Sequence, residues 1–144
     1  MQVSTRFTMA MHTLLCIGYF SGKVKTTSAF LASSVNANPV VIRRVLGQLK
    51  EAGIVTVEPG VGGASLTKDP ADVTMRDVFR AVDSLEGGHL FDFHANPNPQ
   101  CPVGAHVHDL LDSELVDAQA ALERRLSQTT LADLLDRLRQ ETEG

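Results

Sequence analysis

The chain has 144 residues, of which 43% are hydrophobic and 21% are charged, and its formal net charge at pH 7 is -4. This length is sufficient for one modest hydrophobic core, or for a small core with an added assembly helix. Cys16 and Cys101 are too few for a disulfide framework, no signal peptide is recognisable, and the apolar run over 7–20 is too short to span a bilayer, so we expect a cytoplasmic protein without a membrane partner.

The first predicted helix covers 5–20. His12 and Cys16 lie four residues apart on it and therefore share a face. We expect both to pack against the core or a neighbouring helix, and a role as ligands is the alternative. Its core-facing residues are Phe7, Met11, Leu14, Leu15 and Phe20.

A helix-turn-helix is predicted over 26–53. The hydroxyl residues at 26–28 can cap its first helix, which carries an apolar stripe. The tetrapeptide at 36–39 ends that helix, because a residue before proline leaves the α region while Pro39 is preset for the first turn of the next helix. The second helix ends at Gly53. Its inward residues are Ile42, Val45, Leu46 and Leu49, and its outward residues are Arg43, Arg44, Gln48 and Lys50.

A β-hairpin follows directly. Residues 54–58 alternate in polarity and are rich in β-branched side chains, which predicts a first strand. Residues 59–63 form a glycine-rich turn, and residues 64–67 form the second strand. Together these elements predict a winged helix-turn-helix. A helix about 10 to 12 Å wide fits the major groove of DNA. The glycine-rich tip lets the backbone approach a phosphate. We therefore expect a double-stranded DNA partner.

Charge is divided unevenly along the chain. Residues 1–70 hold seven basic and three acidic residues, a net charge of +4, whereas residues 71–144 hold six basic and fourteen acidic residues, a net charge of -8. Attraction for phosphate therefore belongs to the first half. The second half is expected to serve another purpose, unless its acidic residues only form a solvated helix face.

The second half is predicted to hold three helices and one long loop. A capping box of Thr74 and Asp77 opens the first helix, and Thr130 with Asp133 caps the last. Between them, a loop rich in glycine and proline leads to a long helix over 105–127. Its apolar residues form a seam that we interpret as a dimerisation surface, with packing inside one chain as the alternative. The seam consists of Val107, Leu111, Leu115, Ala118, Leu122 and Leu126.

These elements predict a mainly α fold with a small β wing and a long C-terminal dimerisation helix. We divide the chain into a winged DNA-binding domain over 1–83, a sensor-type loop over 84–104, and dimerisation and C-terminal helices over 105–144.

The chain resembles the Rrf family of bacterial winged-helix regulators, which includes the iron-sulfur cluster regulator, the nitric-oxide-sensing repressor and the cysteine-metabolism repressor. The resemblance covers nearly the whole chain. It is carried by six segments. They are the start of the first helix at 3–7, the start of the recognition helix at Asn38-Pro39, the passage from that helix into the hairpin at 53–55, the wing tip at 59–63, the end of the hairpin at 66–68, and the Cys-Pro-Val-Gly loop at 101–104.

The resemblance implies a homodimer in which the long helices pair and two winged domains read the half-sites of a near-palindromic operator. It implies that Gly62 and Gly63 lie at the wing's contact with the minor groove or a phosphate. The residues implied to face the major groove are Ser28, Asn38, Val40, Val41, Arg43 and Arg44.

Metal binding is not expected, and neither is any other cofactor. Cluster-binding members carry three cysteines in the loop before the long helix, whereas this loop has only Cys101. His12 of one chain and Cys101 of the other are the candidates for mixed ligation, but two protein ligands do not hold a cluster. Zinc is also disfavoured, because His106 and His108 diverge by about 200° on the predicted helix.

Cys101 is instead the candidate sensor. It precedes a helix N-terminus, where the helix dipole favours a reactive thiolate. The alternative is that Pro99 and Pro102 fix the loop so that Cys101 only packs beneath it. An enzyme is not expected, because Cys101 and His106 lack a third orienting residue and an oxyanion-hole motif.

The function we predict is a DNA-binding transcriptional regulator, a homodimeric repressor that responds to a redox or small-molecule signal through the Cys101 loop. One alternative is a winged-helix module that binds protein. Another is a repressor regulated by a metal or a cluster.

Overall fold

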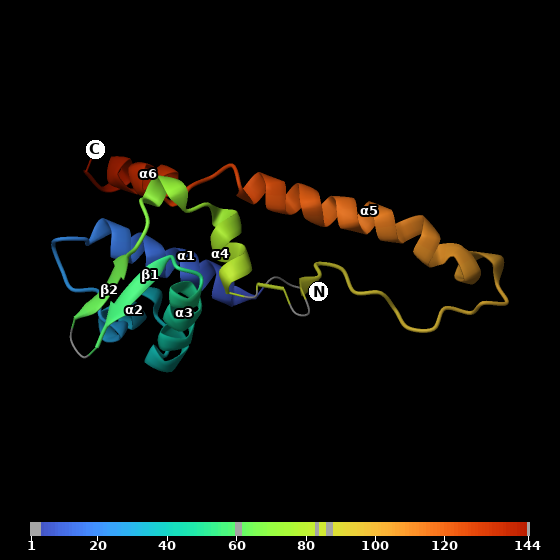
Figure 1. The fold of residues 1–144 in the computed structure, drawn as a ribbon, viewed down its shortest axis with the longest axis horizontal. Coiled ribbons are helices and arrows are strands. Elements are labelled where there is room, and N and C mark those ends of the chain that lie inside the picture. The colour runs from blue at the N-terminus through green and yellow to red at the C-terminus, as the bar shows by residue number, and fades with distance from the viewer. Residues whose placement is uncertain (1–3, 60–61, 83, 86–87, 144) are drawn as a thin grey trace.

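The computed structural model describes all residues except 1–3, 60–61, 83, 86–87 and 144. Over these residues the fold is mainly helical with one two-stranded antiparallel sheet, which confirms the predicted fold class (Figure 1). The elements in chain order are α1 (Thr5–Tyr19), α2 (Ser28–Val35), α3 (Pro39–Glu51), β1 (Val55–Glu58), β2 (Gly63–Leu66), a 3-10 turn η1 (Pro70–Asp72), α4 (Met75–Ala81), α5 (Pro102–Leu126) and α6 (Leu131–Glu143).

Helices α2 and α3 form the predicted helix-turn-helix, and local capping explains where each begins. The Thr27 hydroxyl accepts a hydrogen bond from the Phe30 N–H at 3.2 Å. Asn36 closes α2 in the left-handed region with φ of 61°. The Asn38 carboxamide oxygen then accepts a bond from the Val40 N–H at 2.8 Å, and α3 starts at Pro39.

Strands β1 and β2 form the wing, with Val55 opposite Leu66 and Glu58 opposite Gly63. Each observed strand begins one residue away from the predicted start. The wing is also joined to the segment before α2, a link that the sequence did not reveal. The Ala64 N–H donates to the Thr26 carbonyl at 2.9 Å, and the Thr26 hydroxyl donates to the Ala64 carbonyl at 2.7 Å.

The hydrophobic core lies among α1, α2, α3, α4, the wing and α6. Leu131 and Leu135 of α6 are both buried in it. Gly18 on α1 makes room for this contact, because a Cβ at Gly18 would lie 2.8 Å from a methyl group of Leu135. The predicted unit 105–144 therefore combines two helices that the structure separates, since α6 packs on α1 within the winged domain. The reason is that the apolar face of α6 completes this core.

Replacing Leu135 by alanine is expected to lower the free energy of unfolding by about 2 to 5 kcal/mol, because it removes a buried side chain and leaves a cavity against α1. Urea denaturation followed by circular dichroism measures this change. Arg137→Ala, on the exposed side of α6, is the control and should change stability by less than about 0.5 kcal/mol. Equal stability of the two variants would show that α6 does not belong to this core.

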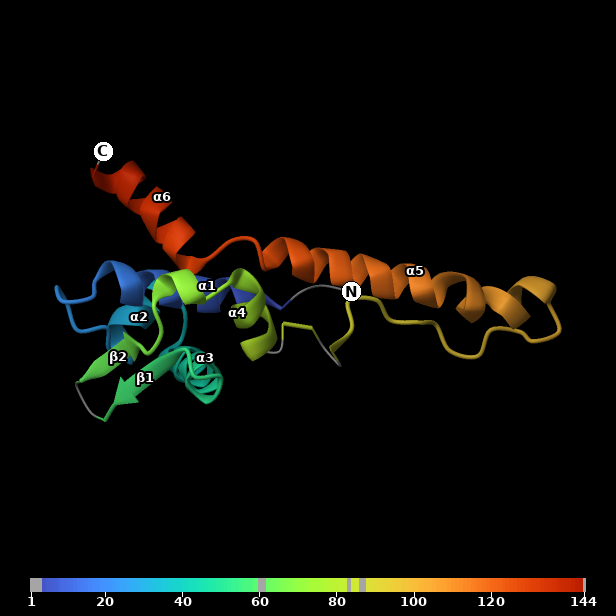
Figure 2. The ribbon, with the colours of Figure 1, turned by 45° about the horizontal axis from the view of Figure 1, so that its top comes forward.

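Helix α5 extends away from the winged domain, as Figures 1 and 2 show, and none of its residues is buried. It begins at Pro102, three residues before the predicted start, because Cys101 is extended (φ -88°, ψ 131°) and serves as the N-cap while Pro102 suits the first turn. Its C-terminal end is held to α4, where Glu123 accepts a 2.6 Å bond from Arg80 and lies 3.7 Å from Arg76. The hydrogen bond from Arg80 lowers the pKa of Glu123.

The segments that lead into α4 and into α6 lie side by side. Thr74 and Thr130 form an isolated antiparallel bridge. On either side of it, the Met75 N–H donates to the Thr129 carbonyl at 2.9 Å and the Leu131 N–H to the Val73 carbonyl at 2.8 Å.

The loop before α5 runs outward from the winged domain alongside that helix, which then runs back toward the domain (Figure 1). Gln119 accepts a bond from the Leu90 N–H at 3.0 Å and donates one to the Gly88 carbonyl at 3.1 Å. Further along, the Phe93 ring stacks on His108 with centroids 3.8 Å apart. Of the helices in the described part of the chain, none combines the length and apolar character needed to cross a membrane.

Candidate nucleic-acid interface

Helix α3 presents one face to the core and the other to solvent. Ile42, Val45 and Leu49 are fully buried, whereas Arg43 and Arg44 are exposed and Val40 is 58% exposed. This division follows from the helical spacing of the apolar residues. The wing lies beside α3, so the exposed face of α3 and the wing form one continuous side of the domain (Figure 2).

Arg43 and Arg44 have no acidic partner, since none of the salt bridges found among the described residues involves them. Arg43 makes one weak internal bond, from Nε to the Pro39 carbonyl at 3.5 Å. Most of the donors of both guanidinium groups therefore face solvent, where an anionic partner can reach them.

The remaining predicted major-groove residues lie at the start of the two helices. Asn38 is exposed, and its carboxamide oxygen is engaged in capping α3, which leaves the NH₂ group available to donate. Ser28 and Val41 are both half-buried, Ser28 in the first turn of α2 and Val41 in the first turn of α3. Their contact with DNA remains a prediction.

The two predicted wing glycines have different surroundings. A Cβ at Gly62 would meet the side chain of Glu58 across the hairpin. Gly63 is buried, has φ of 81°, and lies so close to the backbone of Thr26 that a Cβ would be 3.1 Å from it. Gly63 is thus needed for internal packing, and the DNA contact of both glycines stays a prediction. Residues 60 and 61 of the predicted turn lie outside the described residues.

Cys101 is exposed on an ordered turn. Its N–H donates to the Asn98 carbonyl at 3.2 Å, and the Gln100 N–H donates to the Asn98 side chain at 2.9 Å. Gly104 permits this turn, because a Cβ there would collide with the Asn98 carbonyl. Interaction with the backbone N–H groups of Gly104 and then Val103 lowers the pKa of the Cys101 thiol. The alternative in which Cys101 packs beneath its loop is therefore wrong.

His12 and Cys16 share a face of α1, as predicted, and both contact Ser34 of α2. The His12 Nε2 lies 3.0 Å from the Ser34 Oγ, and the Cys16 thiol donates to it at 3.2 Å. They line an apolar groove of about 570 Å³ along α1. In the described part of the chain, no three His, Cys, Asp or Glu side chains lie close enough together to hold a metal ion.

Comparison with known proteins assigns the family. The family model for Rrf2, described as "Iron-dependent Transcriptional regulator", matches residues 3–137. The chain belongs to the Rrf2 family. This confirms the resemblance, and because the family consists of transcriptional regulators it also confirms that the chain is not an enzyme.

Relatives of this Rrf2 chain cover almost its whole length. The Bacillus subtilis (strain 168) protein named "Putative HTH-type transcriptional regulator YwnA" is 44% identical over 136 residues, which are 94% of this chain and 98% of YwnA. A crystal structure described as that of "a putative DNA binding protein" is 39% identical, with a TM-score of 0.70 over 90% of this chain and 98% of the other. IscR of T. potens shares the fold, with a TM-score of 0.71 and 22% identity over 99% of this chain and 91% of IscR.

The family description names iron, but the described residues of this chain offer no matching set of ligands. Of the two cysteines, Cys16 is buried against Ser34 and Cys101 is alone on its turn. An iron site built from one chain needs at least a third ligand near these, and the described residues supply none.

Proposed function

We propose that this protein is a homodimeric transcriptional repressor that binds a near-palindromic operator. The observation that carries the proposal is the exposed face of α3, where Arg43 and Arg44 lie opposite a buried face and form no salt bridge with any residue that the structure describes. Arginine at this place in a helix-turn-helix can donate to base edges or phosphates in the major groove. A repressor role follows from simple occlusion of a promoter by the bound dimer, which would act in the cytoplasm.

The test is selection of bound sequences from a pool of random DNA duplexes, followed by mobility-shift titration of the selected sequence at several salt concentrations. We expect a two-fold related motif, and an affinity that falls steeply as salt rises because bound lysine and arginine release counterions from DNA. No enrichment of any duplex would favour the alternative, a winged helix that binds protein.

Dimerisation through α5 is supported by its uncovered apolar side chains. The helix is about 38 Å long, at about 1.5 Å per residue. Val103, Leu110 and Leu111 on one side of it are 67%, 63% and 43% exposed. Side chains of this kind in a continuous row are typically buried against a partner. A second copy of the chain has the same apolar side chains, so the two α5 helices can bury them against each other in a two-fold symmetric contact.

The predicted apolar seam does not stay on this open side. Leu115 lines a hollow of about 390 Å³ beneath the loop residues Phe91 and Phe93, whereas Leu110 and Leu111 do not. The reason is that most steps of the seam are four residues, longer than the helical repeat of about 3.6, so the row turns around the helix. We propose that the first half of α5 carries the dimer contact.

The signal is proposed to act at Cys101, by changing the spacing between the two winged domains. Support comes from its full exposure and from the lowered pKa of its thiol, which increases the thiolate fraction that oxidants attack. Oxidation at the start of α5 would then act on the helix that we propose to join the subunits.

Alkylation of Cys101 by iodoacetamide is expected to have a pH midpoint below that of an ordinary thiol, because the thiolate persists to lower pH. The rate is measured from pH 5 to 10 in a Cys16→Ser variant, so that Cys101 is the sole thiol. Glutathione titrated alongside provides the reference. A midpoint at or above that of glutathione would contradict the lowered pKa and remove the chemical basis of the switch.

A further inference from the structure

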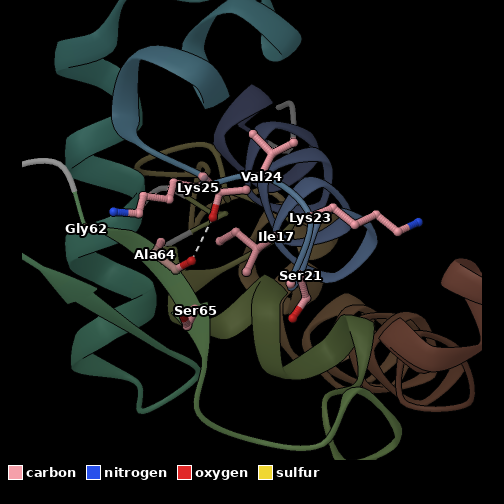
Figure 3. Close-up of a pocket in the computed structure, with 10 residues that line it drawn as sticks. Ile17, Ser21, Lys23, Val24, Lys25, Gly62, Ala64 and Ser65 are labelled. Atoms are coloured by element: carbon pink, nitrogen blue, oxygen red, sulfur yellow. Dashed lines mark hydrogen bonds between the residues drawn. The ribbon is translucent and has the colours of Figure 1, made fainter.

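The segment that joins α1 to α2 lies against the wing and encloses a hollow of about 280 Å³ (Figure 3). Its lining includes Lys23, Lys25 and Thr26 from the segment and Gly62 and Ala64 from the wing. Neither lysine is among the predicted DNA-contact residues, although Lys25 lies only three residues before Ser28.

The wing itself carries no positive charge. Residues 54–67 contain no lysine or arginine, and Glu58 is their one charged residue. Glu58 lies beside Gly62 and would repel a phosphate that approached the tip. Positive charge near the wing therefore comes from residues outside 54–67, of which Lys68 follows β2 at its base and Lys25 extends toward Gly62.

Thr26 holds the neighbouring segment to the wing. Its carbonyl accepts from the Ala64 N–H and its hydroxyl donates to the Ala64 carbonyl, and the bare backbone of Gly63 allows the close approach. The segment thus has a fixed position relative to β2, and a side chain next to Thr26 is placed by the same contacts that place the wing.

The two lysines point in opposite directions. Lys25 extends toward Gly62 and the side of the wing on which α3 lies, while Lys23 extends away from the wing (Figure 3). The Lys23 ammonium lies 5.0 Å from the centre of the Tyr19 ring on α1, in a cation–π contact. Among the described residues, none of the salt bridges includes Lys25.

We propose that Lys25 is a DNA-backbone contact, an ammonium that binds a phosphate beside the wing and supplies the positive charge that the wing lacks. The inference rests on the proposed DNA binding and adds a residue to it. Lysine suits this task because it acts as a compact charge without base preference. Lys25 therefore contributes affinity for any duplex, and sequence selectivity comes from α3.

The experiment compares Lys25→Gln with Lys23→Gln, which makes the same charge change two residues away on the opposite side. Binding of the selected operator and of a random duplex is measured from 50 to 300 mM salt. Lys25→Gln is expected to weaken both duplexes about equally, by roughly tenfold near 0.1 M salt, and to reduce the slope of log affinity against log salt by about 0.9 per bound subunit. Lys25→Arg should retain the slope.

A Lys25→Gln affinity and slope within twofold of Lys23→Gln would overturn the inference, as would a loss confined to the operator. If Arg43→Ala with Arg44→Ala loses operator binding while Lys25→Gln does not, the DNA-binding function stands and the Lys25 contact is wrong. If the wild-type chain binds no duplex, the proposed function and the inference both fail. Both lysines are exposed, so neither variant should disturb folding.

Discussion

Replacing Arg43 and Arg44 together by alanine is expected to abolish specific binding of the operator. Each side chain that reaches a base or phosphate contributes about 1 to 3 kcal/mol, and a dimer in which four such side chains are replaced should lose affinity roughly a thousandfold or more. Both side chains are exposed and α3 is fixed by its buried face, so the thermal unfolding temperature should remain unchanged. Mobility-shift titration of the selected operator measures the loss.

The control for this variant removes the same charge elsewhere. Arg137 and Arg139 lie on the exposed side of α6, and their double alanine variant should bind the operator within a few-fold of the wild type. Retained operator binding by the Arg43 and Arg44 variant would contradict the assignment of α3 as the recognition helix. An equal loss in both variants would indicate attraction by overall charge alone.

Replacing Leu110 and Leu111 by aspartate is expected to convert the dimer to a monomer. Burial of each leucine is worth about 1.5 to 3 kcal/mol, and the dimer would lose four of them, so the dissociation constant should rise on the order of 10⁴-fold or more. Sedimentation equilibrium should then give the chain mass of 15.5 kDa in place of twice that value. Operator affinity should fall in parallel, because the two half-sites would no longer be bound by one linked molecule.

Ala120→Asp provides the control, since Ala120 is exposed on another side of α5. It should remain dimeric and bind the operator normally. A wild-type chain that sediments as a monomer at micromolar concentration would end the dimer proposal, and a dimeric Leu110 and Leu111 variant would move the contact to another surface.

Local signals in the sequence predicted most of the secondary structure. The Asn38-Pro39 start of α3 and the capping boxes at Thr74 and Thr130 all involve residues within three positions of one another, and each is present in the structure. The late prediction for the start of α5 had a local cause as well, because Pro102 was counted with the loop although proline suits a first helical turn.

Contacts between distant residues were not predictable in the same way. An apolar face on α6 does not specify its partner, and its packing on α1 depends on the space left by Gly18, more than a hundred residues earlier. The hydrogen bond from Thr26 to the wing and the salt bridge between Arg80 and Glu123 likewise link segments that are far apart in the sequence. No pattern in a single sequence records such pairs.

The candidate site likewise contains residues that local patterns predict and residues that only distant contacts place. The exposure of Arg43 and Arg44 followed from the helical spacing of the buried residues on α3, so the sequence could predict it. Lys25 could not be found, because its place beside the wing depends on a hydrogen bond that spans 38 positions. The internal role of Gly63 was hidden for the same reason.

The bridge between Thr74 and Thr130 has a consequence for how such a regulator diversifies. Helices α4 and α6 begin side by side at this bridge, and α4 also holds α5 through Arg80 and Glu123, so the loop and α5 between them form an arm with both ends fixed to the winged domain. The loop of this arm can vary in length and chemical content without moving α3 or the wing. A changed loop can therefore bring a new response while α3 and the wing keep their places.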